Sequence, residues 1–363
     1  MVKRNAYTVA SILAAAGIAA AGITAPAVSA APATQLTVAS FNVCKGGPDG
    51  TQAACAAPAP SWSVRRDRVV NVIRASGADV IGLQEVTNNP TPNGAKTMQD
   101  DVKAILAPAG YGTPTFDADG PDNDCKRPRD SNGQLAGPNP CENTAMITFN
   151  TATVQQAGAA GIAMAGNISP GLDNAASQPS APRSVAWAFL KKGGVPFLAI
   201  SAHTAATKDA IHEASRVAFA AGLNSWASNK IASAGLPAET PVVLMADLNS
   251  FDKRQPNGAQ KVFRDNGWMD AFNAPKRTNI RYSTINYTAT ATGDAQGFPR
   301  KPAVTKKTKR NKVGAATRID YIFTRNAPVV SYEVVMHLNA DGSFNQDFQA
   351  SDHQMIKASI QIA

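Results

Sequence analysis

The sequence predicts an α+β fold in which two packed β-sheets form the core and helices lie outside. Strand-like and helix-like segments occur in mixed order along the 363 residues, which is typical of this arrangement. Residues 64–76 have the apolar periodicity of an amphipathic helix, with Val69, Val72 and Ile73 on one face and the basic residues on the other, and Gly77 closes it. Residues 241–246 are an unbroken apolar run typical of a buried strand. No internal repeat and no Ser/Gly-rich linker divides the chain, so we expect one domain over residues 31–363.

The remaining elements follow from apolar runs and the turn residues between them. Further strands are predicted at residues 36–43, 79–84, 145–149, 184–191, 195–202, 319–324, 329–337 and 354–361. Further helices are predicted at residues 97–107, 208–232 and 261–266. Residues 108–143 and 273–316 are rich in turn-forming residues and are expected to be loops.

Residues 1–30 have the pattern of a signal peptide that is removed on export. Lys3 and Arg4 form a positive n-region, residues 9–23 are apolar and rich in alanine, and a small-residue cleavage site ends at Ala30. A membrane anchor is the alternative, but the apolar stretch is short and lacks a stop-transfer flank. We therefore expect a secreted, extracellular protein with no stable membrane association.

The four cysteines all follow this leader, and an even number in an exported chain favours disulfides. Three pairings are possible from the sequence alone. We favour the nearest neighbours, Cys44–Cys55 and Cys125–Cys141, because each pair would staple a loop too polar to pack by itself. A zinc site is the alternative, but the spacings fit no usual ligand pattern.

The formal net charge of +9 suits a polyanionic partner. Part of the excess lies in a basic stretch, residues 300–312, shortly before Asp320. Its cationic residues are Arg300, Lys301, Lys306, Lys307, Lys309, Arg310 and Lys312. This stretch is either a solvated loop or an electrostatic guide for a phosphodiester backbone. Only Phe298 accompanies it, so the sequence gives no support for base stacking there.

Polar residues at the ends of the apolar runs are the most informative feature of the chain. They are carboxylates, amides and imidazoles at, or just beyond, strand ends: Asn42, Glu85, His203, Asp247, Asn249, Asp320, Asp352 and His353. Such groups, collected at one edge of a β-core, can hold a hard divalent cation, move a proton and bind a phosphate.

Several segments around these residues resemble the successive motifs of the endonuclease/exonuclease/phosphatase superfamily, which includes the secreted DNase I-like enzymes. They are Ser-Phe-Asn at 40–42, Gly-Leu-Gln-Glu at 82–85, Ser-Ala-His at 201–203, Asp-Leu-Asn at 247–249, Arg-Ile-Asp-Tyr-Ile at 318–322 and Ser-Asp-His at 351–353. The resemblance spans about residues 35–361. It implies a four-layer α/β/β/α sandwich of two mixed β-sheets and a metal-dependent hydrolase of phosphate esters.

The resemblance also implies a metal site and a phosphate site. Asn42, Glu85 and Asp352 are the expected ligands of Mg²⁺ or Mn²⁺, and hard oxygen donors suit either ion. Glu85 would be costly to bury at the end of an apolar strand unless an ion or a partner compensated its charge. Arg183 and Asn143 are expected to bind substrate phosphate, since a guanidinium fork fits two phosphate oxygens.

The catalytic residues implied by the resemblance are His203, Asp247, Asn249, Asp320 and His353. Asp247 would orient or deprotonate the attacking water, and Asn249 would hydrogen-bond a phosphate oxygen. Asp320 would fix the tautomer of His353 and raise its pKa, so that the imidazolium stabilises the transferring phosphoryl group. His203 is a candidate general acid for the leaving oxygen.

The function favoured by these observations is phosphodiester hydrolysis by metal-assisted in-line attack of water, in a monomeric endonuclease acting on nucleic acid. A sphingomyelinase-like phospholipid phosphodiesterase is an alternative, but it would need an aromatic membrane-facing element, and only 6% of residues are aromatic. A small-molecule phosphatase is also possible. A non-catalytic binding module on the same fold is disfavoured, because residues for every catalytic role are present.

Overall fold

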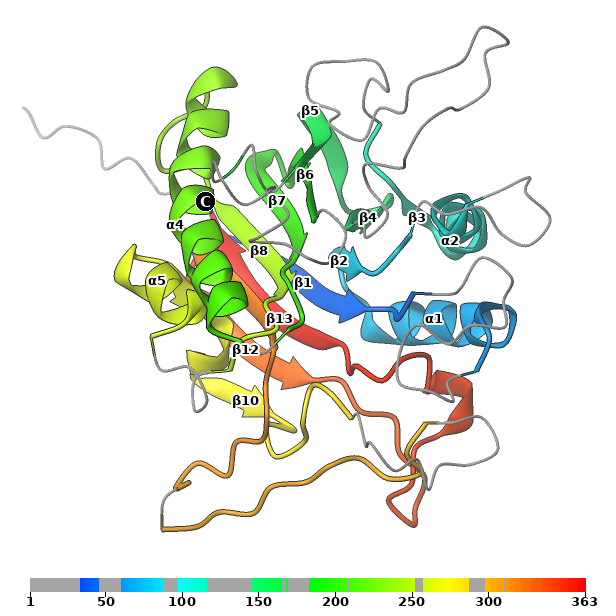
Figure 1. The fold of residues 1–363 in the computed structure, drawn as a ribbon. Coiled ribbons are helices and arrows are strands. Elements are labelled where there is room, and N and C mark those ends of the chain that lie inside the picture. Colours follow the sequence, from blue (N-terminus) through cyan, green and yellow to red (C-terminus); the bar gives the residue numbers. More distant parts are fainter. Residues whose placement is uncertain are drawn as a thin grey trace, which may run out of the picture. The chain divides into compact units, whose positions relative to one another are not determined.

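The computed structural model describes residues 33–45, 60–87, 97–115, 145–164, 168, 183–207, 209–251, 257–286, 298–309 and 311–363 (Figure 1). All of them belong to one compact unit, Ala33–Ala363. The expected signal peptide, residues 1–30, lies outside the described residues, and so do Cys55, Cys125 and Cys141. The leader and both disulfide pairings therefore stay predictions.

Within the described residues, seven strands form the first sheet, in the order β10-β12-β13-β1-β2-β4-β3. They are β1 (Thr34–Asn42), β2 (Val80–Gln84), β3 (Tyr111–Gly112), β4 (Met146–Asn150), β10 (Lys276–Thr278), β12 (Val329–Val334) and β13 (Ile356–Ile362). The sheet is mixed, because the central strand β1 runs antiparallel to β13 and parallel to β2. Strands from the two extremes of the sequence are thus direct neighbours.

The second sheet has six strands in the described residues, in the order β5-β6-β7-β8-β11-β9. They are β5 (Gln155–Met164), β6 (Ser184–Lys192), β7 (Val195–His203), β8 (Val242–Asp247), β9 (Met269–Asp270) and β11 (Asp320–Arg325). Strand β7 is parallel to β8, and β11 is antiparallel to β8. This sheet is therefore also mixed.

The helices form the two outer layers. Helices α1 (Trp62–Ser76) and α2 (Met98–Leu106) pack on the first sheet, while α4 (Ala210–Ser233) and α5 (Ala259–Asp265) pack on the second, on opposite sides of the strands in Figure 1. Short 3₁₀ segments occur at Ala107–Ala109, Ala271–Asn273 and Gln346–Phe348. The predicted four-layer α+β sandwich is confirmed. No helix among these described residues has the length and hydropathy needed to span a bilayer.

Local sequence signals explain where the helices begin and end. Thr97 accepts a hydrogen bond from the backbone of Asp100, whose side chain in turn accepts one from the backbone of Thr97, so a capping box starts α2. Asp209 caps α4, which therefore begins at residue 210 rather than at 208. Gly77 closes α1 with a left-handed φ of 60°.

Strand β5 is the largest element that the sequence analysis missed. Its sequence, Gln-Gln-Ala-Gly-Ala-Ala-Gly-Ile-Ala-Met, is poor in the β-branched and aromatic residues that signal strands. It lies at the edge of its sheet and pairs only with β6, so tertiary pairing rather than local preference forms it. The short strand β10 was likewise placed in a loop, and the strand predicted at 329–337 ends at Val334.

The alternation of side chains along each strand explains why polar groups collect at one edge. On β8, Val243 and Met245 face the other sheet, and Asp247 follows on the same face two residues later. The same spacing places His203 at the end of β7, while Asp320 begins β11. The face between the sheets is therefore apolar in its centre and polar at this end.

The two sheets approach each other closely next to that polar end. A Cβ atom on Gly82 of β2 would lie 2.6 Å from Cβ of Met245 on β8. The side-chain nitrogen of Gln84 donates to Oγ of Ser201 at 3.2 Å and to the carbonyl of Met245 at 3.3 Å. A glycine and one fully buried amide thus set the spacing of the sheets where the polar edge begins.

We predict that Gly82→Ala lowers the free energy of unfolding by about 1–3 kcal/mol, because the added methyl group overpacks the contact with Met245. Gly158→Ala is the matched control, since a Cβ there would meet Phe189 at 3.4 Å, an ordinary contact. Urea denaturation followed by circular dichroism measures both. Equal stabilities of the two variants would contradict the proposed close approach.

Candidate active site

Adjacent strands of the second sheet present three functional side chains in one row. In the strand register His203 lies opposite Asp247, and Asp247 lies opposite Asp320. The first sheet faces this row with Asn42 at the end of β1 and Glu85 directly after β2. Strands β1 and β8 pack against each other across the interface between the sheets (Figure 1). Residues from both sheets therefore contribute to the site.

Asp247 is the centre of this cluster and is only 1% exposed. Its Oδ2 accepts a hydrogen bond from Nδ2 of Asn42 at 3.0 Å, and its Oδ1 accepts one from the backbone N–H of Asn249 at 2.9 Å. The same Oδ2 lies 3.4 Å from Nε2 of His203 and 3.8 Å from Nε2 of His353. Burial, followed by the negative charge of Asp320, raises the pKa of Asp247 to about 7.

His353 is paired with a carboxylate. Its Nδ1 lies 3.1 Å from both oxygens of Asp320, so the imidazole donates to that carboxylate. Burial opposes a charged imidazole, but the charge and the hydrogen bonds of Asp320, with the charges of Asp352 and Asp247, raise the pKa of His353 well above its ordinary value. His353 is therefore an imidazolium at neutral pH.

His203 has the opposite environment. Nη1 of Arg183 lies 3.0 Å from its Nδ1, and Nδ2 of Asn249 lies 3.0 Å from its Nε2 and donates to the carbonyl of Thr204 at 3.1 Å. Guanidinium and amide nitrogens can only donate, so N–H donors face both ring nitrogens. Burial, and then the positive charges of Arg183 and His353, lower the pKa of His203 well below its ordinary value.

Glu85 and Asn42 form the side of the cluster contributed by the first sheet. Nδ2 of Asn42 donates to Oε1 of Glu85 at 3.1 Å as well as to Asp247, while the N–H of Cys44 donates to Oδ1 of Asn42 at 2.9 Å. The N–H of Lys45 donates to Oε2 of Glu85 at 2.8 Å. Glu85 has a left-handed φ of 61°, a costly conformation for a residue with a side chain, and these hydrogen bonds help to hold it.

Asp352 lies beside Glu85 at the start of the last strand segment. Its Oδ1 accepts a hydrogen bond from Oγ of Ser351 at 3.2 Å, and its carbonyl accepts one from the N–H of Asn286 at 2.7 Å. Burial raises the pKa of Asp352, and the negative charge of Glu85 acts in the same direction. These two carboxylates therefore share one region of the site.

Arg65 supports this region of the site. The sequence analysis missed it, because that analysis placed the basic residues of helix 64–76 on the exposed face of the helix. Its guanidinium is 1% exposed, and every hydrogen bond it makes goes to a main-chain carbonyl. The acceptors are Val43 at 2.6 Å, Cys44 at 2.8 Å, Pro60 at 2.8 Å and Ala350 at 3.0 Å. Arg65 thus ties the segment after Asn42 to the segment before Asp352.

The structure therefore brings most of the predicted site residues together. Contacts within 4 Å join Asn42, Glu85, Arg183, His203, Asp247, Asn249, Asp320 and His353. Asp352 is linked to them by its charge interactions with Glu85 and His353. Asn143 lies outside the described residues. Arg65 and Lys45 also belong to the surroundings of the site, and the positive charge of Lys45 acts on His203.

The donor atoms of this cluster fit a divalent cation. Asp247 and Asp320 each offer a ligand atom, and His353 would offer a third only after losing its proton; these atoms lie within 4.8 Å of one another. Glu85 and Asp352 add two further carboxylates. Burial raises the pKa of both Asp247 and Asp352, so a cation that offset their negative charge would stabilise the ionised forms. Hard carboxylate oxygens are the ligands that Mg²⁺ and Mn²⁺ prefer.

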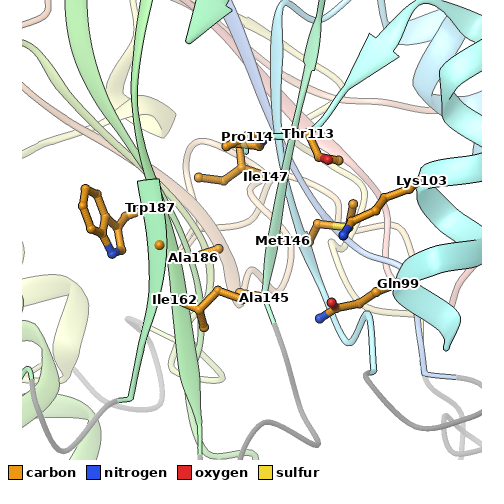
Figure 2. A pocket seen from close by; sticks show the side chains of 11 residues that line it. Gln99, Lys103, Thr113, Pro114, Ala145, Met146, Ile147, Ile162, Ala186 and Trp187 are labelled. Carbon is orange, nitrogen blue, oxygen red and sulfur yellow. The ribbon is translucent and has the colours of Figure 1, made fainter. Parts of the chain in front are cut away.

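An apolar hollow lies elsewhere, between β4 on one side and β5 and β6 on the other (Figure 2). Ala145, Ile147, Ile162 and Trp187 line it, with Lys103 of α2 at one side. Its volume is about 30 Å³, which is enough to hold water. It contains none of the clustered carboxylates or imidazoles, so the chemistry belongs to the polar edge of the two sheets.

A two-sheet sandwich with buried carboxylates and imidazoles at one edge defines a class of hydrolases that act on phosphate esters. Residues 39–353 match the model of the endonuclease/exonuclease/phosphatase family, and the chain belongs to this family. A search of curated proteins found no match to this chain.

Solved structures support the same fold. An endonuclease/exonuclease/phosphatase from Bacteroides vulgatus is 19% identical with a TM-score of 0.58, covering 91% of this chain and 100% of that one. The mannosyl-6-phosphatase Bt3783 of Bacteroides thetaiotaomicron is 19% identical with a TM-score of 0.55, covering 90% and 99%. The catalytic domain of human Nocturnin, with bound sulfate, is 16% identical with a TM-score of 0.50, covering 91% and 94%. At these identities the likeness concerns the fold.

We predict that the two imidazoles of the cluster have opposite charge states in the metal-free protein at pH 7. His353 should be protonated and His203 neutral, because Asp320 stabilises the imidazolium of His353 while burial and Arg183 oppose a charge on His203. Two-dimensional NMR of ¹⁵N-labelled histidine distinguishes these states during a pH titration. Asp320→Asn should lower the pKa of His353, and an unchanged value would contradict the assignment.

Proposed function

We propose that the protein is a secreted, Mg²⁺- or Mn²⁺-dependent phosphodiesterase that cleaves nucleic acid as an endonuclease. The observation that carries the proposal is the contact chain through Asp247, which joins Asn42, His203 and His353 at one edge of both sheets. Phosphodiester hydrolysis needs a base for water, positive charge for the phosphoryl group and a donor for the leaving oxygen. The cluster offers a group for each role.

Asp247 suits the role of orienting and deprotonating water, because its pKa of about 7 favours proton transfer at neutral pH. The imidazolium of His353, held by Asp320, places positive charge where negative charge develops on the phosphoryl oxygens. Asn249 and Arg183 are assigned to hydrogen bonding of the phosphate oxygens, and this is supported by their side-chain nitrogens, which each lie 3.0 Å from the ring of His203.

His203 was expected to be the general acid for the leaving oxygen, and we keep this assignment with one condition. In the substrate-free site its pKa is lowered, so the ring is neutral. The negative charge of a bound phosphodiester would raise that pKa and favour the protonated ring. Proton donation by His203 therefore depends on substrate being present.

Asn42, Glu85 and Asp352 are the proposed holders of the metal ion, and the ion would supply Lewis-acid stabilisation of the phosphoryl group and the leaving oxygen. Asn42 already contacts both Glu85 and Asp247 through its side-chain nitrogen, so it connects the metal region to the base. Arg65 interacts through its charge with Asp352 and Glu85, and its hydrogen bonds hold the segment after Asn42 to the segment before Asp352.

Nucleic acid is the proposed substrate because of the net charge of +9 and the exposed lysines of the basic stretch. Secretion is proposed from the N-terminal pattern, and a monomer with one domain over residues 31–363 from the absence of an internal repeat or linker in the sequence. A phosphomonoesterase is the second candidate, since the structurally similar Bt3783 is a mannosyl-6-phosphatase.

A plasmid-nicking assay with Mg²⁺ or with EDTA tests the proposal. We expect chelator-sensitive nicking by the wild type and a loss of about 100-fold or more in Asp247→Asn, because an amide cannot accept the proton from water. Asp265→Asn is the matched control, since Asp265 is an exposed carboxylate on α5. His203→Ala and Glu85→Gln should also lose activity.

Two outcomes of this assay would count against the proposal. Turnover of simple phosphomonoesters without nicking would favour the phosphatase, and turnover of sphingomyelin without nicking would favour a phospholipid substrate. Full activity in Glu85→Gln would show that the metal assignment is wrong.

A further inference from the structure

The basic stretch, residues 300–312, is anchored beside the catalytic edge rather than attached loosely to the fold. Residues 281–284 lie between its two arms. On one side the N–H of Ser283 donates to the carbonyl of Ala303 at 3.1 Å, and on the other the N–H of Thr284 donates to the carbonyl of Thr317 at 3.0 Å. The stretch therefore leaves and rejoins the fold at the same place.

That place is continuous with the active site. The carbonyl of Thr284 accepts a hydrogen bond from the N–H of Gln354 at 2.7 Å, and its Oγ1 accepts one from the N–H of Ile319 at 3.2 Å. Ile285 forms a backbone bridge with His353. Thr284 and Ile285 thus hold the root of the basic stretch against the segments that carry Asp320 and His353.

The charge of the stretch is concentrated at its outer part. Arg300 pairs with Asp341 at 3.6 Å, and Nζ of Lys301 donates to the carbonyl of Asp341, so the first two cations are engaged near the root. The outer lysines that the structure describes are all exposed: Lys306, Lys307, Lys309 and Lys312. Within the described part of the chain, no carboxylate lies within 4.0 Å of any of these four ammonium groups.

The turn that carries these lysines is ordered by its own hydrogen bonds. Oγ1 of Thr308 accepts from the N–H of Asn311 at 2.9 Å, and Nδ2 of Asn311 donates to the carbonyl of Ala315 at 2.7 Å. Gly314 has a φ of 73° and donates its N–H to the carbonyl of Asn311 at 3.1 Å. A preordered loop loses less conformational entropy when it binds a partner.

One polymer backbone can contact both the outer lysines and the catalytic edge. A fully extended chain from Lys312 to Asp320 would span at most about 26 Å, so Lys312 lies within that distance of Asp320. Phosphates follow one another every 3.4 Å or so along one strand of a DNA helix. This limit therefore corresponds to about eight nucleotides of a strand.

We propose that the basic stretch is a docking surface for the backbone of a phosphodiester polymer, next to the catalytic edge and separate from it. This inference rests on the proposed function for its substrate class. An anionic membrane is the other partner that lysines attract. Among the described residues, however, the exposed large apolar side chains are Val304 in the stretch and Val313 directly after it, and neither is an aromatic anchor. The backbone of a nucleic acid can be bound by positive charge alone, so it matches these lysines better than a membrane does.

The test uses the full-length protein with the outer lysines replaced by alanine: Lys306, Lys307, Lys309 and Lys312. Binding of a fluorescent 20-nucleotide oligonucleotide in EDTA is followed by anisotropy between 50 and 200 mM salt. We expect affinity at 100 mM salt to fall by about 10- to 100-fold and the slope of log K against log salt to become shallower by up to about 3, about 0.7 for each lysine removed. Turnover of bis(p-nitrophenyl) phosphate with Mg²⁺, a diester too small to reach the stretch, should stay unchanged.

A control variant removes the same charge from α2, β6, α5 and β10. Its alanine substitutions are at Lys103, Lys191, Lys261 and Lys276. Its affinity should remain within about twofold of the wild type, and an equal loss in both variants would overturn the docking surface in favour of a bulk charge effect.

Unchanged oligonucleotide binding in the test variant, with reduced binding to vesicles containing phosphatidylserine, would assign the stretch to a membrane and overturn the proposal. A wild type without any diester turnover would refute the proposed function, yet weakened oligonucleotide binding would still support the docking surface.

Discussion

The burial of Asp247 between two sheets is the constraint on which the site depends. A carboxylate that is 1% exposed is stable only if donors or positive charges surround it, and three of its neighbours meet that need. Asn42 donates from the first sheet, Asn249 donates from the following loop, and the His353 imidazolium lies nearby. The donors and positive charges that stabilise buried Asp247 are also the groups that a reaction at phosphorus requires. The same residues therefore serve both the stability of the fold and the proposed reaction.

The meeting of the sheets is the second requirement, because the cluster draws on both. Gly82 allows the backbones to come close, and Gln84 links the facing strands through Ser201 and Met245. Arg65 holds two loops together in a similar way, because it donates hydrogen bonds to the carbonyls of Val43 and Ala350, which lie far apart in the sequence. The site is thus positioned by a tightly packed interior and by a buried guanidinium, while its reactive groups remain at the edge.

The sequence was sufficient for elements whose local pattern agrees with their final environment. Strand β8 is an unbroken apolar run that ends in Asp247, and its role in the sandwich could be predicted from period and position. Strand β5 could not, because alanine and glycine form it only through pairing with β6. Arg65 shares a helix face with Val69 and Ile73, four and eight residues on, so periodicity did carry a signal. A charged residue on an apolar face was wrongly taken as exposed, since its acceptors are main-chain carbonyls that no sequence pattern identifies.

The pairing of β1 with β13 has a consequence for how the molecule is assembled. Thr34 lies opposite Ile362, so the centre of one sheet forms only when segments more than 300 residues apart have come together. His353 lies three residues before β13, so it joins the acidic residues of the cluster together with that strand. Such long-range contacts slow folding. A site built this way is complete only after β13 has paired with β1.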